Sequence, residues 1–276
     1  MVDKSLVLVS DDGNVRTLTL SDSASLNSLG ETLAGELFAQ LRLAEAEPGV
    51  RVVVITGAGK MFCAGGNLKD FAAVTEPLDQ YIRRVMGVLY NPLAEFIEVM
   101  ETPLISAVNG PAIGAGVGLA LSADLVIMAE SAFFSLPFVP HLGVVPDMGT
   151  SWFLPRELGY KRALGLALTG EKLLAADAYG AGLVWECVGV DGFSRRVGEV
   201  AESIARLPLS AVLATKKAFS AAVTNTLTEQ LSLERQLQAV CFGSEEFSEG
   251  LSAFAEKRPP DFVTIAAGAS TMGVDA

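Results

Sequence analysis

The segment NGPAIGAG (residues 109–116) and the run LISAV (residues 104–108) before it decide how the chain folds. The run is short and mostly apolar, which is typical of a parallel strand that is buried on both faces. Glycines follow it where a loop leads into a short helix, and glycine permits left-handed backbone angles and a close approach to the backbone. The segment therefore predicts a buried strand, a glycine loop and a helix in succession.

A second segment, nearer the N-terminus, repeats this order. The run RVVVIT (residues 51–56) is nearly all apolar and precedes FCAGGNLK (residues 62–69). Free backbone N–H groups at the start of a helix can bind an anion or a developing oxyanion. Either loop alone is better explained as a turn, whereas two loops that each supply one N–H make an oxyanion site a competitive explanation.

Strand and helix signals alternate through the first part of the chain. Besides the two runs above, strands are expected at residues 15–20 and 125–129, and helices at residues 26–46 and 78–100. Strands that alternate with helices predict an α/β fold.

The C-terminal part has a different pattern. Strand signals disappear after about Asp191, and residues 199–255 have the spacing of successive amphipathic helices. We expect a boundary near Leu207-Pro208, which gives an α/β core over residues 1–207 and a helical region over residues 208–276.

The composition excludes several classes of partner. The 276 residues are 50% hydrophobic, and a net charge of −12 argues against a nucleic-acid surface, which needs clustered lysine and arginine. The most apolar stretch, residues 112–121, is too short to span a membrane. Three scattered cysteines fit the reduced cytoplasm, and a single histidine, His141, leaves no basis for a histidine-rich metal site.

Three other ligand or nucleophile motifs fail. Val54 stands where the phosphate loop G-x-x-x-x-G-K needs its first glycine, and Phe62 stands where the dinucleotide pattern G-x-G-x-x-G needs its last. The nucleophile elbow G-x-S-x-G is absent from the sequence.

Both glycine loops resemble signature segments of the enoyl-CoA hydratase/isomerase (crotonase) superfamily. Residues 62–69 resemble its F-x-A-G-x-D-L-K segment, and residues 107–124 resemble A-V-x-G-x-x-x-G-G-G-x-x-L-A-x-x-x-D. The similarity continues through residues 134–156 and returns at residues 253–258. It covers essentially the whole chain.

The resemblance implies a fold, an assembly and a substrate class. The implied fold is a spiral of ββα units followed by a C-terminal helical trimerisation region, with homotrimers often paired into hexamers. The implied substrate is an acyl-CoA thioester that reacts through its enolate. Coenzyme A is then part of the substrate, and no separate cofactor is expected.

The resemblance also assigns roles by position. The backbone N–H groups of Gly66 and Ala115 would form the oxyanion hole. Phe254 and Lys257 match C-terminal residues that reach a coenzyme A held mainly by a neighbouring subunit, although Lys257 alone is better explained as a solvated lysine. The other residues expected to bind the substrate are Leu26, Ala64 and Leu68.

The choice between hydratase and isomerase depends on carboxylates. Hydratases of the family use two glutamates, and Gly118 and Phe138 occupy those two positions here. The segment LGVVPDMG (residues 142–149) instead resembles the L-G-L-x-P-D-x-G segment of the enoyl-CoA isomerase branch, which includes ring-opening isomerases of phenylacetate breakdown. In that branch the acid at the position of Asp147 moves one proton between two carbons of the enolate. One base is sufficient for a double-bond shift, because the proton removed at C2 can be returned at C4.

Two of these residues also have ordinary structural explanations. Asp147 follows a proline and precedes a helical stretch at residues 149–158, so it could be a helix N-cap. His141 is better explained as a buried histidine bonded to the backbone, with a place in the substrate pocket as the alternative.

The sequence thus predicts an enoyl-CoA isomerase with Gly66 and Ala115 as oxyanion donors and Asp147 as base. Enoyl-CoA hydration and thioester hydrolysis stay open, because a fold does not fix a reaction. A non-catalytic acyl-CoA-binding protein, in which Asp147 is only a cap, also stays open.

Overall fold

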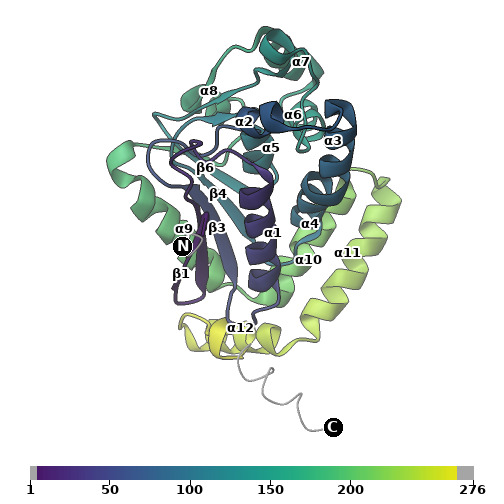
Figure 1. Ribbon diagram of the computed structural model, residues 1–276. Helices are drawn as coiled ribbons and strands as arrows, with labels where there is room; N and C mark the ends of the chain where they lie inside the picture. The colour runs from purple at the N-terminus through teal and green to yellow at the C-terminus, as the bar shows by residue number, and fades with distance from the viewer. Residues whose placement is uncertain (1–4, 266–276) are drawn as a thin grey trace. The chain divides into compact units, whose positions relative to one another are not determined.

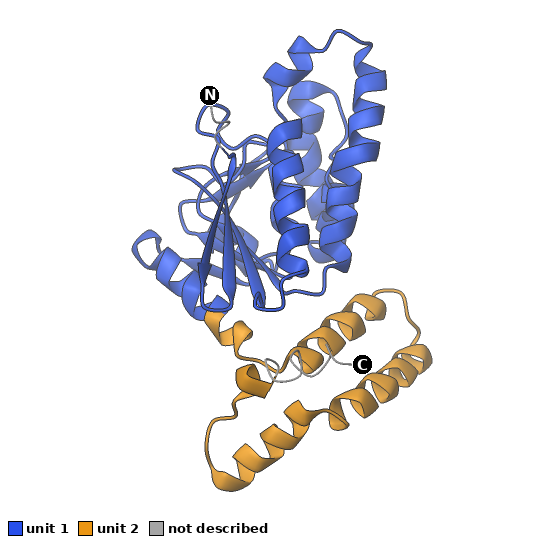
Figure 2. Cartoon of the chain, turned by 60° about the horizontal axis from the view of Figure 1, so that its bottom comes forward, with its two compact units in different colours: residues 1–201 blue, residues 202–276 orange. Residues whose placement is uncertain are grey.

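The computed structural model describes residues 5–265 (Figure 1). The chain divides into two compact units between Ala201 and Glu202 (Figure 2). The first unit holds the described strands with their accompanying helices, and the second is helical. The prediction of an α/β fold is confirmed.

Within residues 5–265, six strands form the larger sheet, in the order β1-β2-β3-β4-β6-β9. β1 is antiparallel to β2, and the later neighbours are parallel to one another. All residues of β4 are buried, which explains its apolar sequence. The strands are β1 (Val7–Asp12), β2 (Val15–Leu20), β3 (Val52–Gly57), β4 (Leu104–Val108), β6 (Leu125–Ala129) and β9 (Glu186–Val188).

The predicted strands agree with this sheet. β2, β4 and β6 have the expected bounds, and β3 is displaced by one residue. The sequence does not reveal β1, because all of its residues except Val7 are exposed and show no apolar face. Its pairing with β2, over the whole length of both strands, holds it in the sheet.

A smaller sheet lies beside the second glycine loop. Over the described residues it has three strands in the order β5-β7-β8, with β5 parallel to β7 and β7 antiparallel to β8. The Gly114 N–H donates to the Ser135 carbonyl at 2.9 Å, so the sheet also anchors the residue after β5. The strands are β5 (Ala112–Ile113), β7 (Phe133–Ser135) and β8 (Leu173–Leu174).

Helix α1 (Glu31–Glu45) packs against β1 and β2 (Figure 1). Its buried residues include Leu33, Leu37 and Leu41, which repeat at helical spacing. The prediction of a helix from residue 26 is wrong for its first five residues. Leu26 and Asn27 both have φ of 59°, a left-handed angle that a right-handed helix excludes.

The predicted single helix over residues 78–100 is three segments. α3 (Leu78–Val85) leads into a π-helical turn, η1 (Met86–Tyr90), which leads into α4 (Asn91–Val99). A π turn bonds i to i+5 and inserts an extra residue, so it changes the direction of the side chains that follow. The apolar spacing of the sequence does not reveal this interruption.

The short helix after the second glycine loop, α5 (Ala115–Leu121), is confirmed and contacts β4. The last helix of the first unit, α9 (Phe193–Ala205), ends within the second. The remaining helical segments of the first unit are α2 (Leu68–Ala73), η2 (Phe138–Leu142), α6 (Thr150–Glu157), α7 (Tyr160–Thr169), α8 (Ala175–Gly180) and η3 (Val190–Gly192).

The second unit is built from α10 (Leu209–Ala222), α11 (Leu227–Phe242) and α12 (Glu245–Glu256). The carboxylate of buried Glu246 accepts hydrogen bonds from the N–H groups of Leu209 at 2.8 Å and Ser210 at 3.1 Å. A negative group at these first-turn N–H groups stabilises the start of α10. Glu246 thereby ties α12 to α10.

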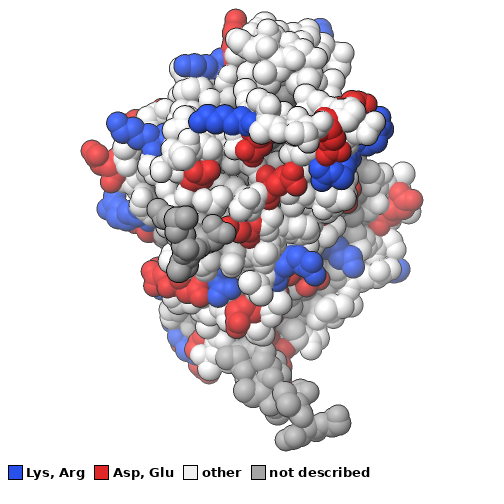
Figure 3. Space-filling model, viewed as in Figure 1, with Lys and Arg blue, Asp and Glu red and all other residues white. Residues whose placement is uncertain are grey.

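Charged residues of both signs are interspersed on the face that Figure 3 shows, with uncharged residues between them. The net charge of −12 therefore does not form one continuous acidic patch on that face. Among residues 5–265, none of the helices is both long and apolar enough to cross a bilayer.

Asn27 holds the loop between β2 and α1. Its buried side chain donates from Nδ2 to the carbonyl oxygens of Ala58 at 3.1 Å and Met61 at 2.9 Å. Its Oδ1 accepts from the Asp22 N–H at 3.0 Å. Asparagine also tolerates a left-handed backbone better than most side chains. One residue therefore joins this loop to the loop after β3.

Replacing Asn27 with alanine should lower the free energy of unfolding by about 2–4 kcal/mol, because buried carbonyl groups lose partners and alanine disfavours the left-handed angle. Urea denaturation measures the change. Asn14→Ala is the matched control, since it removes one exposed bond to the Gly49 carbonyl, at 2.8 Å. It should cost less than about 1 kcal/mol. Equal losses in the two variants would contradict the role given to Asn27.

Candidate active site

Three loops meet at one edge of the larger sheet. They follow β2, β3 and β4 and cover residues 21–30, 58–67 and 109–111. These strands are parallel to one another, so their carboxyl ends lie at the same edge. In open α/β sheets, ligands bind in the crevice outside this edge.

The two glycine loops are joined backbone to backbone. The Phe62 N–H donates to the Pro111 carbonyl at 3.1 Å, and the Ile113 N–H donates to the Cys63 carbonyl at 2.9 Å. Cys63 and Ala112 form a parallel bridge between these bonds. The first loop is therefore held beside β5 by an isolated bridge.

The two loops approach each other closely at Gly65. A Cβ at this position would lie 2.5 Å from the Ile113 carbonyl oxygen and 3.3 Å from the Ala115 nitrogen. Gly65 also has φ of 86°, which only glycine adopts at little cost. The approach and the backbone angle both require glycine here.

The Gly66 N–H is oriented by its own peptide group. The Leu29 N–H donates to the Gly65 carbonyl at 2.8 Å. In a trans peptide the C=O and the following N–H point in opposite directions, so the Gly66 N–H points away from Leu29. Among the hydrogen bonds of residues 5–265, none uses this N–H.

The Ala115 N–H is oriented in the same way. The Val117 N–H donates to the Gly114 carbonyl at 2.9 Å, which fixes the peptide that carries the Ala115 N–H. Ala115 is the first residue of α5, where an N–H has no partner within the helix. Two N–H groups without protein acceptors in the described chain therefore come from adjoining loops.

Asp147 lies in the loop before α6. Burial raises the pKa of its carboxyl to about 6. Its Oδ1 is buried and has no hydrogen-bond partner among the described residues. Gly149 is the N-cap of α6, and no side chain of the described chain caps that helix. The N-cap explanation of Asp147 is therefore wrong.

At Gly118 and Phe138, which correspond to the two glutamates of the family's hydratases, the space is occupied by other atoms of the protein. A Cβ on Gly118 would lie 2.3 Å from the Met148 carbonyl oxygen and 2.8 Å from the Thr150 Oγ1. Phe138 is buried, and its ring lies 3.6 Å from the position of a Cβ on Gly114. The packing leaves no room for a carboxylate at residue 118.

The family model for enoyl-CoA hydratase/isomerase matches residues 10–264. The chain belongs to this family. It has the α/β crotonase fold, with two sheets of mixed strands followed by C-terminal helices. The family implies an acyl-CoA substrate, and both loops that carry the unpaired N–H groups lie within the matched residues.

Some of the relatives are named as hydratases and one is named as an isomerase. "Probable enoyl-CoA hydratase" of Rhodobacter capsulatus is 42% identical, over 89% of this chain and 93% of its own length. The 1,2-epoxyphenylacetyl-CoA isomerase of Escherichia coli is 40% identical, over 90% and 94%. The crystal structure of enoyl-CoA hydratase from Bacillus anthracis superposes with a TM-score of 0.87 and 34% identity, over 93% and 98%. The comparisons establish the family and leave the reaction undecided.

Three predicted substrate-binding residues lie around the first glycine loop. The Ala64 N–H donates to the Leu26 carbonyl at 3.2 Å, so these two residues are adjacent. Leu68 is the first residue of α2, two positions after Gly66. The side chains of Leu26 and Leu68 are each 54% exposed, although both are apolar.

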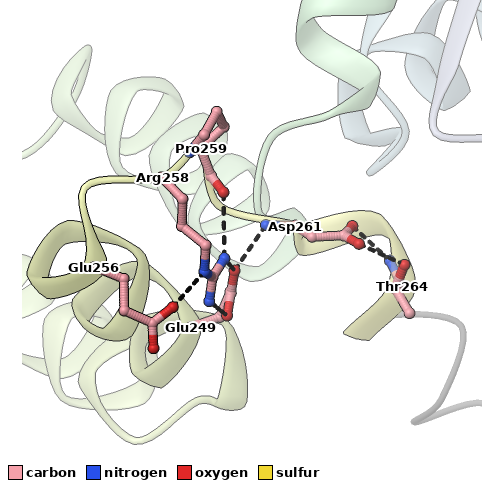
Figure 4. Close-up of polar contacts among 6 residues, drawn as sticks. All are labelled: Glu249, Glu256, Arg258, Pro259, Asp261 and Thr264. Atoms are coloured by element: carbon pink, nitrogen blue, oxygen red, sulfur yellow. Dashed lines mark hydrogen bonds and ion pairs between the residues drawn. The ribbon is translucent and has the colours of Figure 1, made fainter.

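Phe254 and Lys257 lie together at the end of α12, in the second unit. Phe254 is 83% exposed, and Lys257 caps the helix with a left-handed φ of 57°. The next residue, Arg258, is held by Glu249 and Glu256 and donates to the Pro259 carbonyl (Figure 4). These contacts link Arg258, the residue after Lys257, to the side chains of α12.

His141 does not fit the expectation of a buried histidine. Phe138 is the buried residue of the turn η2, and His141 lies at its exposed end. The His141 Cε1 is 3.6 Å from the position of a Cβ on Gly170, at the end of α7. The apolar ring of Phe138 is the side chain of this turn that is buried, and His141 is left exposed.

Tyr90 is part of the site although no motif indicates it. Its Oη donates to the Leu29 carbonyl at 2.6 Å. Burial raises the pKa of Tyr90, and the charges of nearby groups that include Asp147 raise it further. Its position depends on the π turn η1, which the sequence pattern does not reveal.

Replacing Gly65 with alanine should lower the free energy of unfolding by about 2–4 kcal/mol and abolish turnover, because the new methyl group would force the loops apart. Gly59→Ala is the matched control: Gly59 also has a left-handed φ, 75°, but no atom lies within 4 Å of its Cβ position. That variant should lose only about 1 kcal/mol and stay active. Urea denaturation and an activity assay compare the two. A Gly65→Ala protein as active as Gly59→Ala would refute the close-approach argument.

Proposed function

We propose that this chain is an acyl-CoA isomerase that shifts a carbon–carbon double bond through a thioester enolate. The observation that carries the proposal is the buried carboxyl of Asp147, whose pKa is raised to about 6. Such a group is largely ionised at neutral pH and is still basic enough to accept a proton from carbon next to a polarised thioester.

The reaction needs one base and two hydrogen-bond donors. The Asp147 carboxylate removes a proton from C2 of a 3-enoyl thioester, and the electron pair of that bond delocalises onto the thioester oxygen. The N–H groups of Gly66 and Ala115 donate to this oxygen. Protonated Asp147 then returns the proton at C4, which leaves the double bond between C2 and C3. No atom is gained or lost.

The two oxyanion donors would account for much of the rate enhancement, because they stabilise the negative charge that develops on the thioester oxygen. Removing one such donor from an acyl-transfer enzyme costs about 10²–10³ in kcat. The donors here are backbone groups that are already oriented by the bonds to the Gly65 and Gly114 carbonyls, at 2.8 Å and 2.9 Å. They therefore need little reorganisation when charge develops.

Hydration is less well supported. Adding water requires groups within hydrogen-bond reach to hold and activate it. Gly118 has no room for a carboxylate because the Met148 carbonyl is 2.3 Å from its Cβ position, and Phe138 presents a buried ring.

We further propose a subunit arrangement and a coenzyme A site. Phe254 and Lys257 would contact the coenzyme A of a neighbouring subunit in a homotrimer or a hexamer of paired trimers. A lysine ammonium suits the nucleotide phosphates. The residues that would line the channel in the first unit are Leu26, Ala64 and Leu68.

The purified chain should convert 3-hexenoyl-CoA to 2-hexenoyl-CoA without gain of water, as read by chromatography and mass. Asp147→Asn should lower kcat by about 10²–10⁴-fold, because the amide cannot accept the proton. Binding of the thioester should change little. Asp79→Asn, at an exposed position in α3, is the matched control and should keep full activity.

Three results would count against this assignment. Rapid hydration of 2-hexenoyl-CoA by the unaltered chain would make it a hydratase. Release of free coenzyme A would make it a thioesterase. Unchanged turnover in Asp147→Asn would remove that residue from the chemistry and leave acyl-CoA binding alone.

The pH dependence follows from the raised pKa of Asp147. The base must be ionised, so kcat/KM should fall about tenfold per pH unit below about 6 and level off above it. The folded pKa exceeds the unfolded value of about 3.9, so ionisation costs stability as the pH rises through 6. Asp147→Asn, which carries no charge, should therefore be more stable by about 1–3 kcal/mol at pH 7.5 and equal near pH 4. Thermal unfolding at the two pH values measures this, and a variant less stable at pH 7.5 would contradict it.

A further inference from the structure

We propose that Tyr90 is a positioning residue that holds the Gly66 N–H in its productive orientation through Leu29. The inference rests on the proposed role of Gly66 as an oxyanion donor. It assigns to Tyr90 no contact with the reacting atoms.

Two hydrogen bonds connect Tyr90 to the Gly66 peptide. The Tyr90 Oη donates to the Leu29 carbonyl at 2.6 Å, and the Leu29 N–H donates to the Gly65 carbonyl at 2.8 Å. The Gly65 carbonyl and the Gly66 N–H belong to one planar peptide group. A movement of Leu29 therefore tilts the Gly66 N–H directly.

Leu29 needs an anchor because its segment is not part of a continuous sheet. It forms an isolated bridge with Gly66 rather than an extended ladder. Two residues shortly before it, Leu26 and Asn27, have left-handed backbone angles that cost conformational energy in non-glycine residues. A short, non-repetitive segment of this kind is held by individual hydrogen bonds. Tyr90 supplies one of them at Leu29, the residue whose N–H is bonded to the Gly65 carbonyl.

The π turn accounts for the position of Tyr90. Residues of an α-helix are about 100° apart around its axis. One residue inserted at η1 (Met86–Tyr90) therefore rotates the side chains on either side of it relative to an unbroken helix. π turns inside helices often occur at functional sites. Here the π turn contacts α1, and its last residue, Tyr90, donates a hydrogen bond to the Leu29 carbonyl.

The hydroxyl of Tyr90 is a donor and not an acid in this arrangement. Its proton is directed at the Leu29 carbonyl. Burial and the nearby groups Tyr81, Glu31, Asp147 and Asp70 raise the pKa of Tyr90, so the hydroxyl stays neutral at working pH. A neutral hydroxyl with a fixed acceptor can hold a backbone group in place throughout the reaction.

The test compares Tyr90→Phe with Tyr81→Phe. Both changes delete one hydroxyl, from the adjoining segments α3 and η1. The Tyr81 Oη, however, donates to the Glu31 carboxylate at 2.8 Å and not to Leu29. Tyr90→Phe keeps the ring, so it should fold, and thermal unfolding checks this. It should lower kcat for 3-hexenoyl-CoA by about 10–100-fold with KM within about threefold, because a misplaced donor weakens only transition-state binding. Tyr81→Phe should keep kcat within about threefold.

A second readout reports the donors without turnover. 4-(Dimethylamino)cinnamoyl-CoA cannot isomerise, and its absorption band moves to longer wavelength as the thioester carbonyl is polarised. The unaltered chain and Tyr81→Phe should give the full shift, and Tyr90→Phe a clearly smaller one. A merely structural loss of stability would not change the band of the bound probe.

The outcomes separate this inference from the proposed function. If the unaltered chain turns over 3-hexenoyl-CoA and Tyr90→Phe matches it in kcat and in band shift, Tyr90 has no positioning role and the proposed function stands. If the unaltered chain neither isomerises the substrate nor shifts the band, the oxyanion proposal fails and the role of Tyr90 fails with it. Equal losses in Tyr90→Phe and Tyr81→Phe would also overturn the inference, because the Leu29 bond would then be irrelevant.

Discussion

The backbone contact between the two glycine loops is the constraint on which the rest of the site depends. The Ile113 N–H donates to the Cys63 carbonyl at 2.9 Å, and Gly65 lies so close to the Ile113 carbonyl that no side chain fits between them. The parallel order of β3 and β4 brings both loops to one edge of the sheet. Because the bonded peptides cannot rotate freely, the N–H groups of Gly66 and Ala115 are oriented before a ligand arrives. Such preorganisation is what makes oxyanion stabilisation strong.

The parts of the fold that could be predicted are those that short-range patterns determine. β2 follows from alternating polar and apolar residues, β4 and β6 follow from short, mostly apolar runs, and α5 follows from the glycine loop before it. The start of α1 could not be predicted, because Asn27 makes side-chain bonds to Ala58 and Met61, more than thirty residues away. Those bonds favour a left-handed turn where helical spacing alone favours a helix. The exposed edge strand β1 depends similarly on pairing that its own sequence does not show.

The motif resemblance points to Gly66 and Ala115, and the structure leaves the N–H groups of both without an acceptor in the described chain. Their role as oxyanion donors stays a prediction. The environments of the side chains nearby could not be predicted from the sequence. The state of Asp147 depends on burial, which only the folded chain determines, and the same holds for the exposed position of His141. Tyr90 carries no signal at all, because a π turn has no sequence pattern that distinguishes it from the helix around it.

The burial that would suit Asp147 to the proposed role of base also makes ionisation of its carboxyl unfavourable for the stability of the fold. A carboxyl with a pKa of about 6 is ionised at neutral pH. Its ionisation lowers the free energy of unfolding, because burial disfavours the charged form. An arginine beside it, or a role as helix cap, would relieve that cost, but either would lower the pKa and weaken the base. Gly149 caps α6 instead, and the Asp147 Oδ1 is left without a partner in the described chain. Local stability and the proposed reaction make opposite demands on this residue, which is the kind of conflict that functional sites retain.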